Sequence, residues 1–201
     1  MSVLVIYCHP SKTSYTYEIL CKLKEVLNDE NIKFQISDLY AMNFQTDMTE
    51  DEYMREGFAN LDLPIPDDVK KEHQKIAKVD CILFLYPLWW SDCPAKMKGW
   101  FDRVFNVGYA YGTDKSEKKS KTMKTIPKGI VICTAGHSNE FLNEIGIAQS
   151  MRTVMLDDRL GERFKSKEMM ILGGTIDIEK VRIAHKEMIE AVGRIIKQIK
   201  N

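Results

Sequence analysis

The sequence predicts an α/β protein in which a five-stranded parallel sheet, in strand order 2-1-3-4-5, lies between two layers of helices. Three observations support this fold. Apolar runs rich in β-branched residues alternate with segments whose apolar residues recur at helical spacing. The strand-like runs are apolar throughout, as in parallel sheets that helices cover on both faces. The chain has 201 residues, and no linker or internal repeat divides it, so residues 1–201 are expected to form a single domain.

Two strands and two helices are expected in the first part of the chain. The run VLVIY predicts a strand at 3–7. The segment 15–27 predicts a helix because its apolar residues share one face, namely Ile19, Leu20, Leu23 and Leu27. A second strand is expected at 34–39. The stretch 40–66 is expected to be irregular, and a helix with acidic residues at its start follows at 67–79.

The rest of the chain is expected to supply three more strands, each followed by a helix. The strands are apolar runs at 81–85, 129–133 and 169–172. The helices are expected at 94–105, 145–156 and 177–199. Ser91 or Asp92 is the predicted cap of the first of these helices, and the last carries one stripe formed by Ile178, Val181, His185, Met188, Val192, Ile195 and Ile199. The stretch 112–128, with the charge run KSEKKSKTMK, is expected to be a surface loop.

The composition narrows the function. Lys+Arg and Asp+Glu are equal at 29 each, so the net charge is zero. A nucleic-acid binder would usually be basic, and an acidic shuttle that steers to its partners by charge is also disfavoured. The balance therefore suits an enzyme that acts on small molecules and does not bind nucleic acid.

The cysteines and the start of the chain predict a cytoplasmic protein. Five cysteines without a CxxC pair indicate free thiols in a reducing compartment, and no ligand cluster supports a metal site. The chain opens on a strand without the features of a signal peptide. No apolar run approaches the roughly 20 residues that span a bilayer, so a transmembrane segment is not expected.

The predicted topology places a ligand crevice at the carboxyl ends of the strands, between the first and the third. The segment CHPSKTSYT follows the first strand and leads hydroxyl residues into a helix. A helix start offers unpaired amides and a positive dipole end, which suit phosphate, and Thr13, Ser14 and Thr16 can add hydroxyl donors. Ordinary capping of the helix is the alternative. His9 begins this loop and is either a phosphate ligand or a structural residue.

Two further loops are expected at the same edge. The segment PLWWS follows the third strand, and its indoles can wall a flat heterocycle while its backbone amides bond the polar edge. The alternative is that Trp89 and Trp90 are core or dimer-contact residues. The segment TAGHSN follows the fourth strand, and its small residues allow a ligand to approach the backbone closely, although a plain turn explains them equally well.

Three segments in this order carry a family resemblance. HPSKTSYT, SDLYAMNF and PLWW…PAKMKGWFDRVF…GYAY resemble the signature of the NAD(P)H:quinone oxidoreductase family, which has a flavodoxin-like fold, a three-layer α/β/α sandwich. The resemblance implies a tightly bound flavin, FAD with FMN as the alternative, and NAD(P)H as a substrate. It also implies a homodimer with the active site at the subunit interface. Hydride would pass from NAD(P)H through the flavin to a quinone or a similar flat acceptor.

The resemblance also implies which residues contact the flavin. The phosphate region would be held by His9, Thr13, Ser14, Tyr15 and Thr16. The isoalloxazine would be bordered by Pro87, Leu88, Trp89 and Trp90 on one side and by Thr134, Ala135 and Gly136 on the other. Arg182 falls near the position of an arginine beside the adenosine half of FAD, with a solvated surface arginine as the alternative. The substrate pocket would contain Trp90, Phe141 and, from the partner subunit, Tyr111.

The chain departs from the family at the groups that manage protons. Phe141 takes the place of a tyrosine and Ala148 that of a histidine, and neither can act as acid or base, so no catalytic side chain is predicted. His137 can supply a proton or is a plain exposed residue. Three other functions compete with the enzyme: a flavin-binding regulatory subunit of a potassium-efflux system, a one-electron carrier, and an interaction scaffold without a cofactor.

Overall fold

The computed structural model describes residues 1–112 and 121–200, and its sheet has the predicted order β2-β1-β3-β4-β5 with every pair parallel. The strands are β1 Ser2–Tyr7, β2 Lys33–Asp38, β3 Cys81–Pro87, β4 Ile126–Thr134 and β5 Phe164–Leu172. The α-helices are α1 Tyr15–Asp29, α2 Glu50–Phe58, α3 Asp67–Ile76, α4 Ala95–Val104, α5 Asn139–Glu144, α6 Ile147–Arg152 and α7 Ile178–Lys197. The flavodoxin-like three-layer prediction is thereby confirmed.

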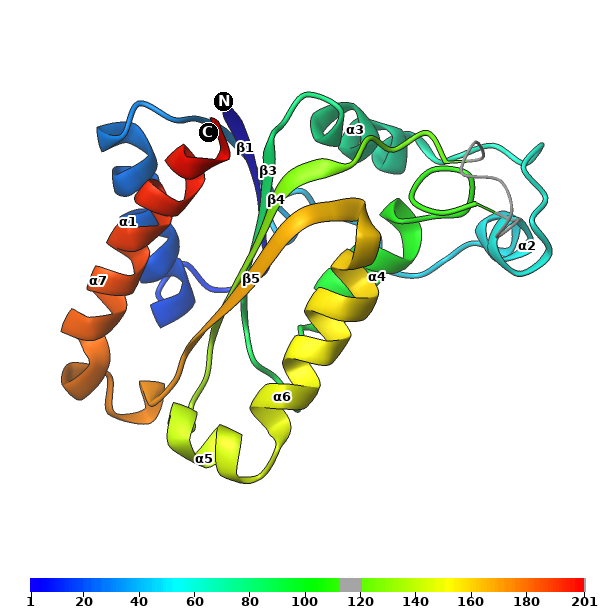
Figure 1. Cartoon of the computed structure of the whole chain (residues 1–201). Coiled ribbons are helices and arrows are strands. Elements are labelled where there is room, and N and C mark those ends of the chain that lie inside the picture. The colour runs from blue at the N-terminus through cyan, green and yellow to red at the C-terminus, as the bar shows by residue number, and fades with distance from the viewer. Residues whose placement is uncertain (113–120, 201) are drawn as a thin grey trace.

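Two helical layers cover the sheet (Figure 1). Helices α1 and α7 pack on one face, and α3, α4 and α6 pack on the other. Alternate side chains of β1 enter the two cores, because successive residues of a strand point to opposite faces. Val3, Val5 and Tyr7 join the α1/α7 core, whereas Leu4 and Ile6 join the other.

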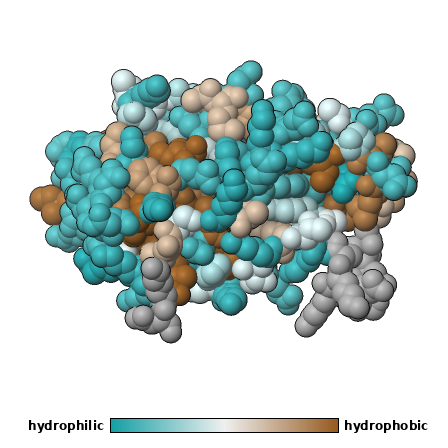
Figure 2. All heavy atoms as spheres, turned by 90° about the horizontal axis from the view of Figure 1, so that it is seen from above, coloured by the Kyte–Doolittle hydropathy of each residue, from teal (hydrophilic) through white to brown (hydrophobic). Residues whose placement is uncertain are grey.

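The parallel register brings the carboxyl ends of the strands to one edge. Tyr7 lies opposite Leu85, and Pro87 lies opposite Thr134. The loops that follow β1, β3 and β4 therefore meet at the end of the molecule where α5 lies (Figure 1). Figure 2 views the opposite end, where β1 begins, and shows mainly hydrophilic residues with smaller hydrophobic areas between them.

The stretch 40–66, predicted to be irregular, contains helix α2. This helix was missed because its buried face is charged and carries no apolar stripe. Thr49 and Glu52 form a capping box at its start. The buried guanidinium of Arg55 donates to the carbonyls of Leu61 and Leu63 at 2.8 Å each and so holds the loop that follows. Polar bonds, and not an apolar face, fix this segment.

Other boundaries also differ from the prediction. β4 begins at Ile126, within the stretch expected to be irregular, and β5 begins at Phe164, because their outer residues complete the ladder between edge and inner strands. The charge run KSEKKSKTMK falls largely on residues 113–120, which lie outside the described residues.

The helix expected at 145–156 is interrupted by a change of winding. Helix α5 precedes it and α6 begins it, and a π-helix then runs from Thr153 to Leu160. π-helical turns are rare and frequently lie at functional sites. The predicted cap of α4 was wrong as well, because α4 starts after Pro94 without a side-chain cap. The carboxylate of Asp92 is engaged elsewhere, as described below.

Candidate functional site

The loop after β1 wraps its own hydroxyl groups around the start of α1. The Oγ of Ser14 accepts from the amide of Tyr17 at 3.1 Å and donates to the carbonyl of Ser11 at 2.9 Å. Ser14 is thus a helix cap, the alternative that the sequence left open. The hydroxyls of Ser11 and Thr13 lie 2.9 Å apart. Since one hydrogen suffices for that bond, the other hydroxyl hydrogen remains available to a ligand.

His9 is anchored by the backbone of Ser11. Its Nδ1 lies 3.0 Å from the amide nitrogen of Ser11 and 3.2 Å from the carbonyl oxygen of the same residue, and the tautomer of the ring decides which of the two it bonds. Burial disfavours the imidazolium and lowers the pKa of His9, which favours the neutral ring at neutral pH. The ring of His9 also meets that of Trp89 edge to face, with 5.8 Å between centroids.

Direct contacts join the three loops pairwise. The hydroxyls of Thr16 and Thr134 lie 2.7 Å apart in the buried interior and tie the start of α1 to the end of β4. The amide of Leu88 donates to the carbonyl of Thr134 at 2.8 Å and ties the loop after β3 to β4. The contact between the rings of His9 and Trp89 joins the loop after β1 to the loop after β3. The residues predicted around the phosphate and both flavin edges therefore share one region.

The loop after β3 is a tight turn with two unusual backbone angles. Trp89 and Asp92 exchange amide-to-carbonyl bonds of 3.0 and 3.2 Å. Between them, Trp90 and Ser91 have φ of 49° and 64°. Such angles favour glycine or asparagine, and a bulky residue there costs on the order of 1–3 kcal/mol. The side chain of Trp90 is nonetheless fully exposed, at 102%. A strained turn that displays an indole to solvent fits a binding surface better than a core.

An ion pair between Asp92 and Arg159 connects this turn to the π-helix. The Arg159 guanidinium donates to both carboxylate oxygens of Asp92, at 2.7 and 2.8 Å. Burial of Asp92 opposes its ionisation, but the bonds from Arg159 outweigh this, and the pKa of the carboxyl lies below its usual value. The same carboxylate accepts from the amide of Cys93 at 2.7 Å. Arg159 was not predicted, because it reaches the site from the π-helix.

The loop after β4 is held by the segment beyond β5. The carbonyl of Ala135 accepts from both the amide and the hydroxyl of Thr175, at 3.0 Å each. Gly136 is exposed at the surface of this loop, and Ile176, 82% exposed, stands over it. The ring of His137 lies 4.6 Å from that of Phe141, which places Phe141 beside the loop. Ile176 was missed because it lies in a turn after the last strand and follows no motif.

Arg182 and Tyr111 differ in their relation to this region. Arg182 lies over the ring of Tyr15, 5.8 Å from its centroid, and is paired with Glu18 and Glu179. Tyr111 lies elsewhere in the chain. Its hydroxyl bonds the carboxylate of Glu56, and it lines a groove of about 390 Å³. Its predicted place in a partner's site remains a prediction.

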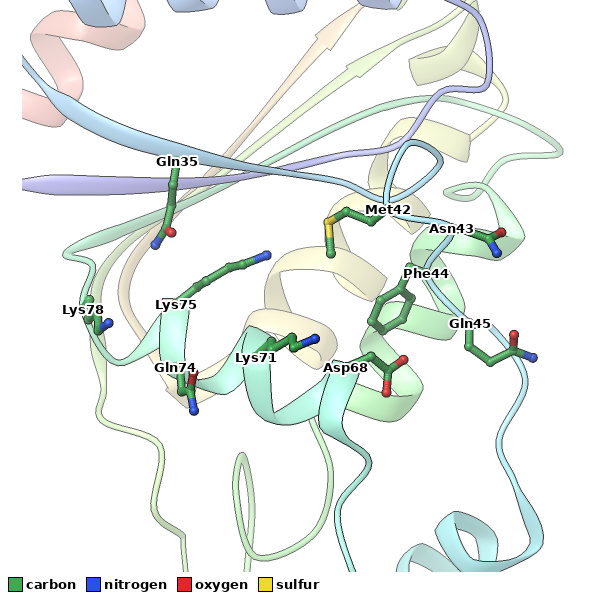
Figure 3. A pocket seen from close by; sticks show the side chains of 10 residues that line it. All are labelled: Gln35, Met42, Asn43, Phe44, Gln45, Asp68, Lys71, Gln74, Lys75 and Lys78. Carbon is green, nitrogen blue, oxygen red and sulfur yellow. The ribbon is translucent and has the colours of Figure 1, made fainter.

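A cavity of about 510 Å³ lies apart from the three loops (Figure 3). Lys71 and Lys75 of α3 face it from one side and Met42 from another. Phe44 forms part of its wall. Since its lining comes from α3, β2 and the segment after β2, this cavity is not the predicted flavin site.

The expected free thiols are confirmed, because all five cysteines are unpaired and four of them are buried. Within residues 1–112 and 121–200, no group of His, Cys, Asp and Glu side chains could hold a metal ion. Over the same residues, the structure contains no helix with the length and apolar character needed to cross a membrane.

The fold agrees with that of known proteins. A family model described as a flavodoxin-like fold matches residues 1–161, and the chain belongs to that family. It is 30% identical to an uncharacterized NAD(P)H oxidoreductase of Haemophilus influenzae, over 78% of this chain and 75% of that protein. It is also 30% identical to the Cavia porcellus NAD(P)H dehydrogenase (quinone) 1, over 76% of this chain but 59% of the relative.

A solved structure gives the same result. An NAD(P)H:quinone oxidoreductase from Methanothermobacter marburgensis superposes with a TM-score of 0.87 and is 41% identical. The match covers 98% of this chain and 96% of that one. The predicted resemblance to the NAD(P)H:quinone oxidoreductase family is therefore confirmed.

Proposed function

We propose that this chain is a flavin-dependent NAD(P)H oxidoreductase that reduces quinones or similar flat acceptors. The observation that carries the proposal is the convergence of a capped helix start, an exposed indole on a strained turn and a close-approach loop at one sheet edge. The names of the relatives support the same class of enzyme. The overall reaction takes NAD(P)H, a proton and a quinone to NAD(P)⁺ and a hydroquinone.

The side chains and amides at this edge fit a flavin phosphate. The amides of Tyr15 and Thr16 lack intrahelical partners, as the first amides of every helix do, whereas the amide of Tyr17 bonds Ser14, and a helix of 15 residues adds the positive end of its dipole. The free hydroxyl hydrogen of the Ser11–Thr13 pair is a further donor, and Nε2 of His9 is another in the tautomer whose Nδ1 accepts from the Ser11 amide. We assign the phosphate to this loop, with Tyr15 and Thr16 in the first helical turn.

The flat part of the cofactor would lie between the other two loops. The bound flavin would supply the hydride chemistry, accepting from the nicotinamide and donating to the acceptor. Pro87, Leu88 and Trp89 would border one edge, and the amides of Trp90 and Ser91 take no part in the bonds that close their turn, so they can bond the polar edge of the ring. Ala135 and Gly136 would approach the other edge.

Proton supply at this site does not rest on the usual groups. The family resemblance implies a tyrosine and a histidine at the positions of Phe141 and Ala148. Neither of these side chains can ionise, and Ala148 is also buried. His137 is exposed beside Phe141. We therefore assign orientation and water exclusion to the loops and name no obligatory acid.

We favour FMN over the FAD that the sequence resemblance suggested. Arg182 forms ion pairs with Glu18 and Glu179, which already balance its charge. An arginine so paired is a weaker ligand for an adenosine diphosphate. Flavin released from the purified protein and separated by chromatography will distinguish FMN from FAD.

We further propose that two copies of the chain complete the site. Tyr111 is 41% exposed and lines a surface groove, where the site of a partner chain could meet it. Light scattering of the purified protein should give twice the chain mass. A monomer with full turnover would contradict this arrangement.

The first test of the function is an absorbance spectrum, followed by anaerobic addition of NADH or NADPH. Yellow protein that either nucleotide bleaches, and a quinone restores, supports the oxidoreductase. Yellow protein that neither nucleotide bleaches contradicts turnover and favours a regulatory flavin-binding subunit or a carrier. Colourless protein that takes up neither FMN nor FAD contradicts the flavin site altogether.

A further inference from the structure

The turn that carries Trp90 is held in a conformation that its own residues disfavour. Trp90 and Ser91 both lie in the left-handed region, where an indole side chain is a rare occupant. The backbone within the turn supplies two bonds, both between Trp89 and Asp92. A turn of this kind persists only where its surroundings determine it. An external contact that fixes it is therefore to be expected.

The Asp92–Arg159 pair has the geometry of such a contact. The guanidinium meets both carboxylate oxygens, and this bidentate arrangement fixes direction as well as distance. Arg159 is itself held, because its side chain is 9% exposed and its guanidinium lies 5.5 Å from the centroid of the Phe101 ring. A well-packed arginine thus binds Asp92, the last residue of the strained turn.

The segment that supplies Arg159 also lies against the turn. A cavity of about 110 Å³ is lined by Ser91 and Asp92 of the turn and by Met151 and Met155 of α6 and the π-helix. Packing therefore leaves space beside Ser91, and the ion pair with Arg159 is a directional contact on this side of the turn.

We infer that Arg159 is a positioning residue that acts through Asp92 to hold the turn 89–92, so that Trp90 stands where a flat acceptor docks. The part of this inference that concerns the acceptor rests on the proposed function. Arg159 itself contacts neither the acceptor nor the cofactor in this arrangement. The expected consequence is that Arg159 affects the affinity for ring-shaped acceptors more strongly than it affects flavin binding, since the flavin is also held by the loops after β1 and β4.

Amide hydrogen exchange tests the structural half without any turnover. Arg159→Gln and Asp92→Asn should each speed exchange at the amides of Trp89 and Asp92 by tenfold or more. The double variant should exchange no faster than either single one, because both remove the same interaction. Arg159→Lys should restore little of the protection against exchange, since an ammonium group cannot form the bidentate bonds that a guanidinium makes to a carboxylate. The matched control is Arg152→Gln, an arginine of α6 that bonds the carbonyl of Ala148 in its own helix.

Steady-state kinetics tests the functional half with two acceptors. Menadione is a flat quinone that must dock, whereas ferricyanide is a small inorganic oxidant that needs no ring pocket. In Arg159→Gln the KM for menadione should rise at least threefold, and this change should exceed any loss of flavin content or of the ferricyanide rate per bound flavin. The Arg152→Gln control should match the wild type with both acceptors.

The outcomes separate this inference from the proposed function. Unchanged exchange in both single variants overturns it, and so does an unchanged menadione KM in variants whose turn has loosened. Parallel loss of both activities together with flavin also overturns it, because Arg159 would then support the cofactor site. A wild-type protein without flavin overturns the proposed function and the acceptor role with it, while the exchange experiment still decides whether Arg159 holds the turn.

Discussion

The hydroxyl oxygens of Thr16 and Thr134 lie 2.7 Å apart with both side chains buried, and this single bond connects the start of α1 to the end of β4. It therefore joins the loop assigned to the phosphate with the strand end assigned to the flavin edge. A buried hydroxyl is costly when its partner is lost, but the loss of both partners leaves no unsatisfied group.

Thr134→Val is expected to lower the free energy of unfolding by about 1–3 kcal/mol, because it leaves the Thr16 hydroxyl buried and unpaired. The double variant Thr16→Val/Thr134→Val should be more stable than that single variant. Urea unfolding of the wild type, of both single variants, Thr16→Val and Thr134→Val, and of the double variant measures these effects. A double variant whose loss equals the sum of two large single losses would show that the hydroxyls act independently.

Removal of the hydroxyls from the phosphate loop should weaken flavin retention. Thr13→Ala/Ser14→Ala loses a donor to the phosphate and the cap of α1, so flavin occupancy on purification should fall severalfold. Thr49→Ala is the control, since it removes the same kind of cap from α2 and costs a similar ~0.5–2 kcal/mol of stability. Equal flavin loss in the control would assign the effect to stability and not to the loop.

Trp90→Ala should change acceptor preference more than flavin content. The indole is fully exposed on its turn, so its removal costs little folding stability and mainly removes a docking surface. The ratio of kcat/KM values for menadione and ferricyanide should fall, while the flavin absorbance per chain stays constant. If both acceptors lose activity in proportion to lost flavin, Trp90 belongs to the cofactor site.

The strands and the position of the site could be predicted because both follow from local pattern and topology. Apolar runs identify buried parallel strands, and parallel pairing then brings loops such as 87–91 and 134–139 to one edge. The Asp92–Arg159 pair could not be predicted, because its members are 67 residues apart and meet only when a π-helix sets the direction of Arg159. Helix α2 was missed for a related reason, since it is fixed by the buried charges of Glu52 and Arg55.

Stability should fall on mild acidification because three histidines are partly or fully buried and favour the neutral ring. Burial lowers the pKa of His9, His73 and His185 below the ordinary value of about 6.5. As the pH falls through about 6.5, the unfolded chain takes up protons that the folded chain does not, so stability is lost from there downward.

The variant His73→Gln tests the contribution of one of these histidines. Nε2 of His73 lies 2.8 Å from the carbonyl of Val104, and its ring stacks on that of Tyr109 at 3.4 Å, so a protonated ring has little room for solvent. Urea unfolding at pH 7.5, 6.5 and 5.5 should show a shallower loss in this variant. His137→Gln, which changes an exposed histidine, should keep the wild-type slope. An identical slope in all three proteins would place the titrating groups elsewhere.

Arg103 should be among the most sensitive positions for folding. Its side chain is buried, and its guanidinium donates to Glu52 at 2.7 Å and to Asp68 at 2.6 Å, which ties α4 to α2 and α3. Arg103→Leu leaves the Glu52 carboxylate buried without its cation, so urea unfolding should show a loss of about 3–5 kcal/mol.

Two further variants decide whether an unpaired charge causes that loss. Arg103→Leu/Glu52→Leu should recover part of the stability, because no buried carboxylate then lacks its arginine. Lys98→Ala removes an exposed cation of the same helix from its pair with Asp102, and it should cost no more than about 1 kcal/mol. If the double variant is less stable than Arg103→Leu alone, the arginine contributes through packing of its stem, and the ion pair with Glu52 is a minor contribution.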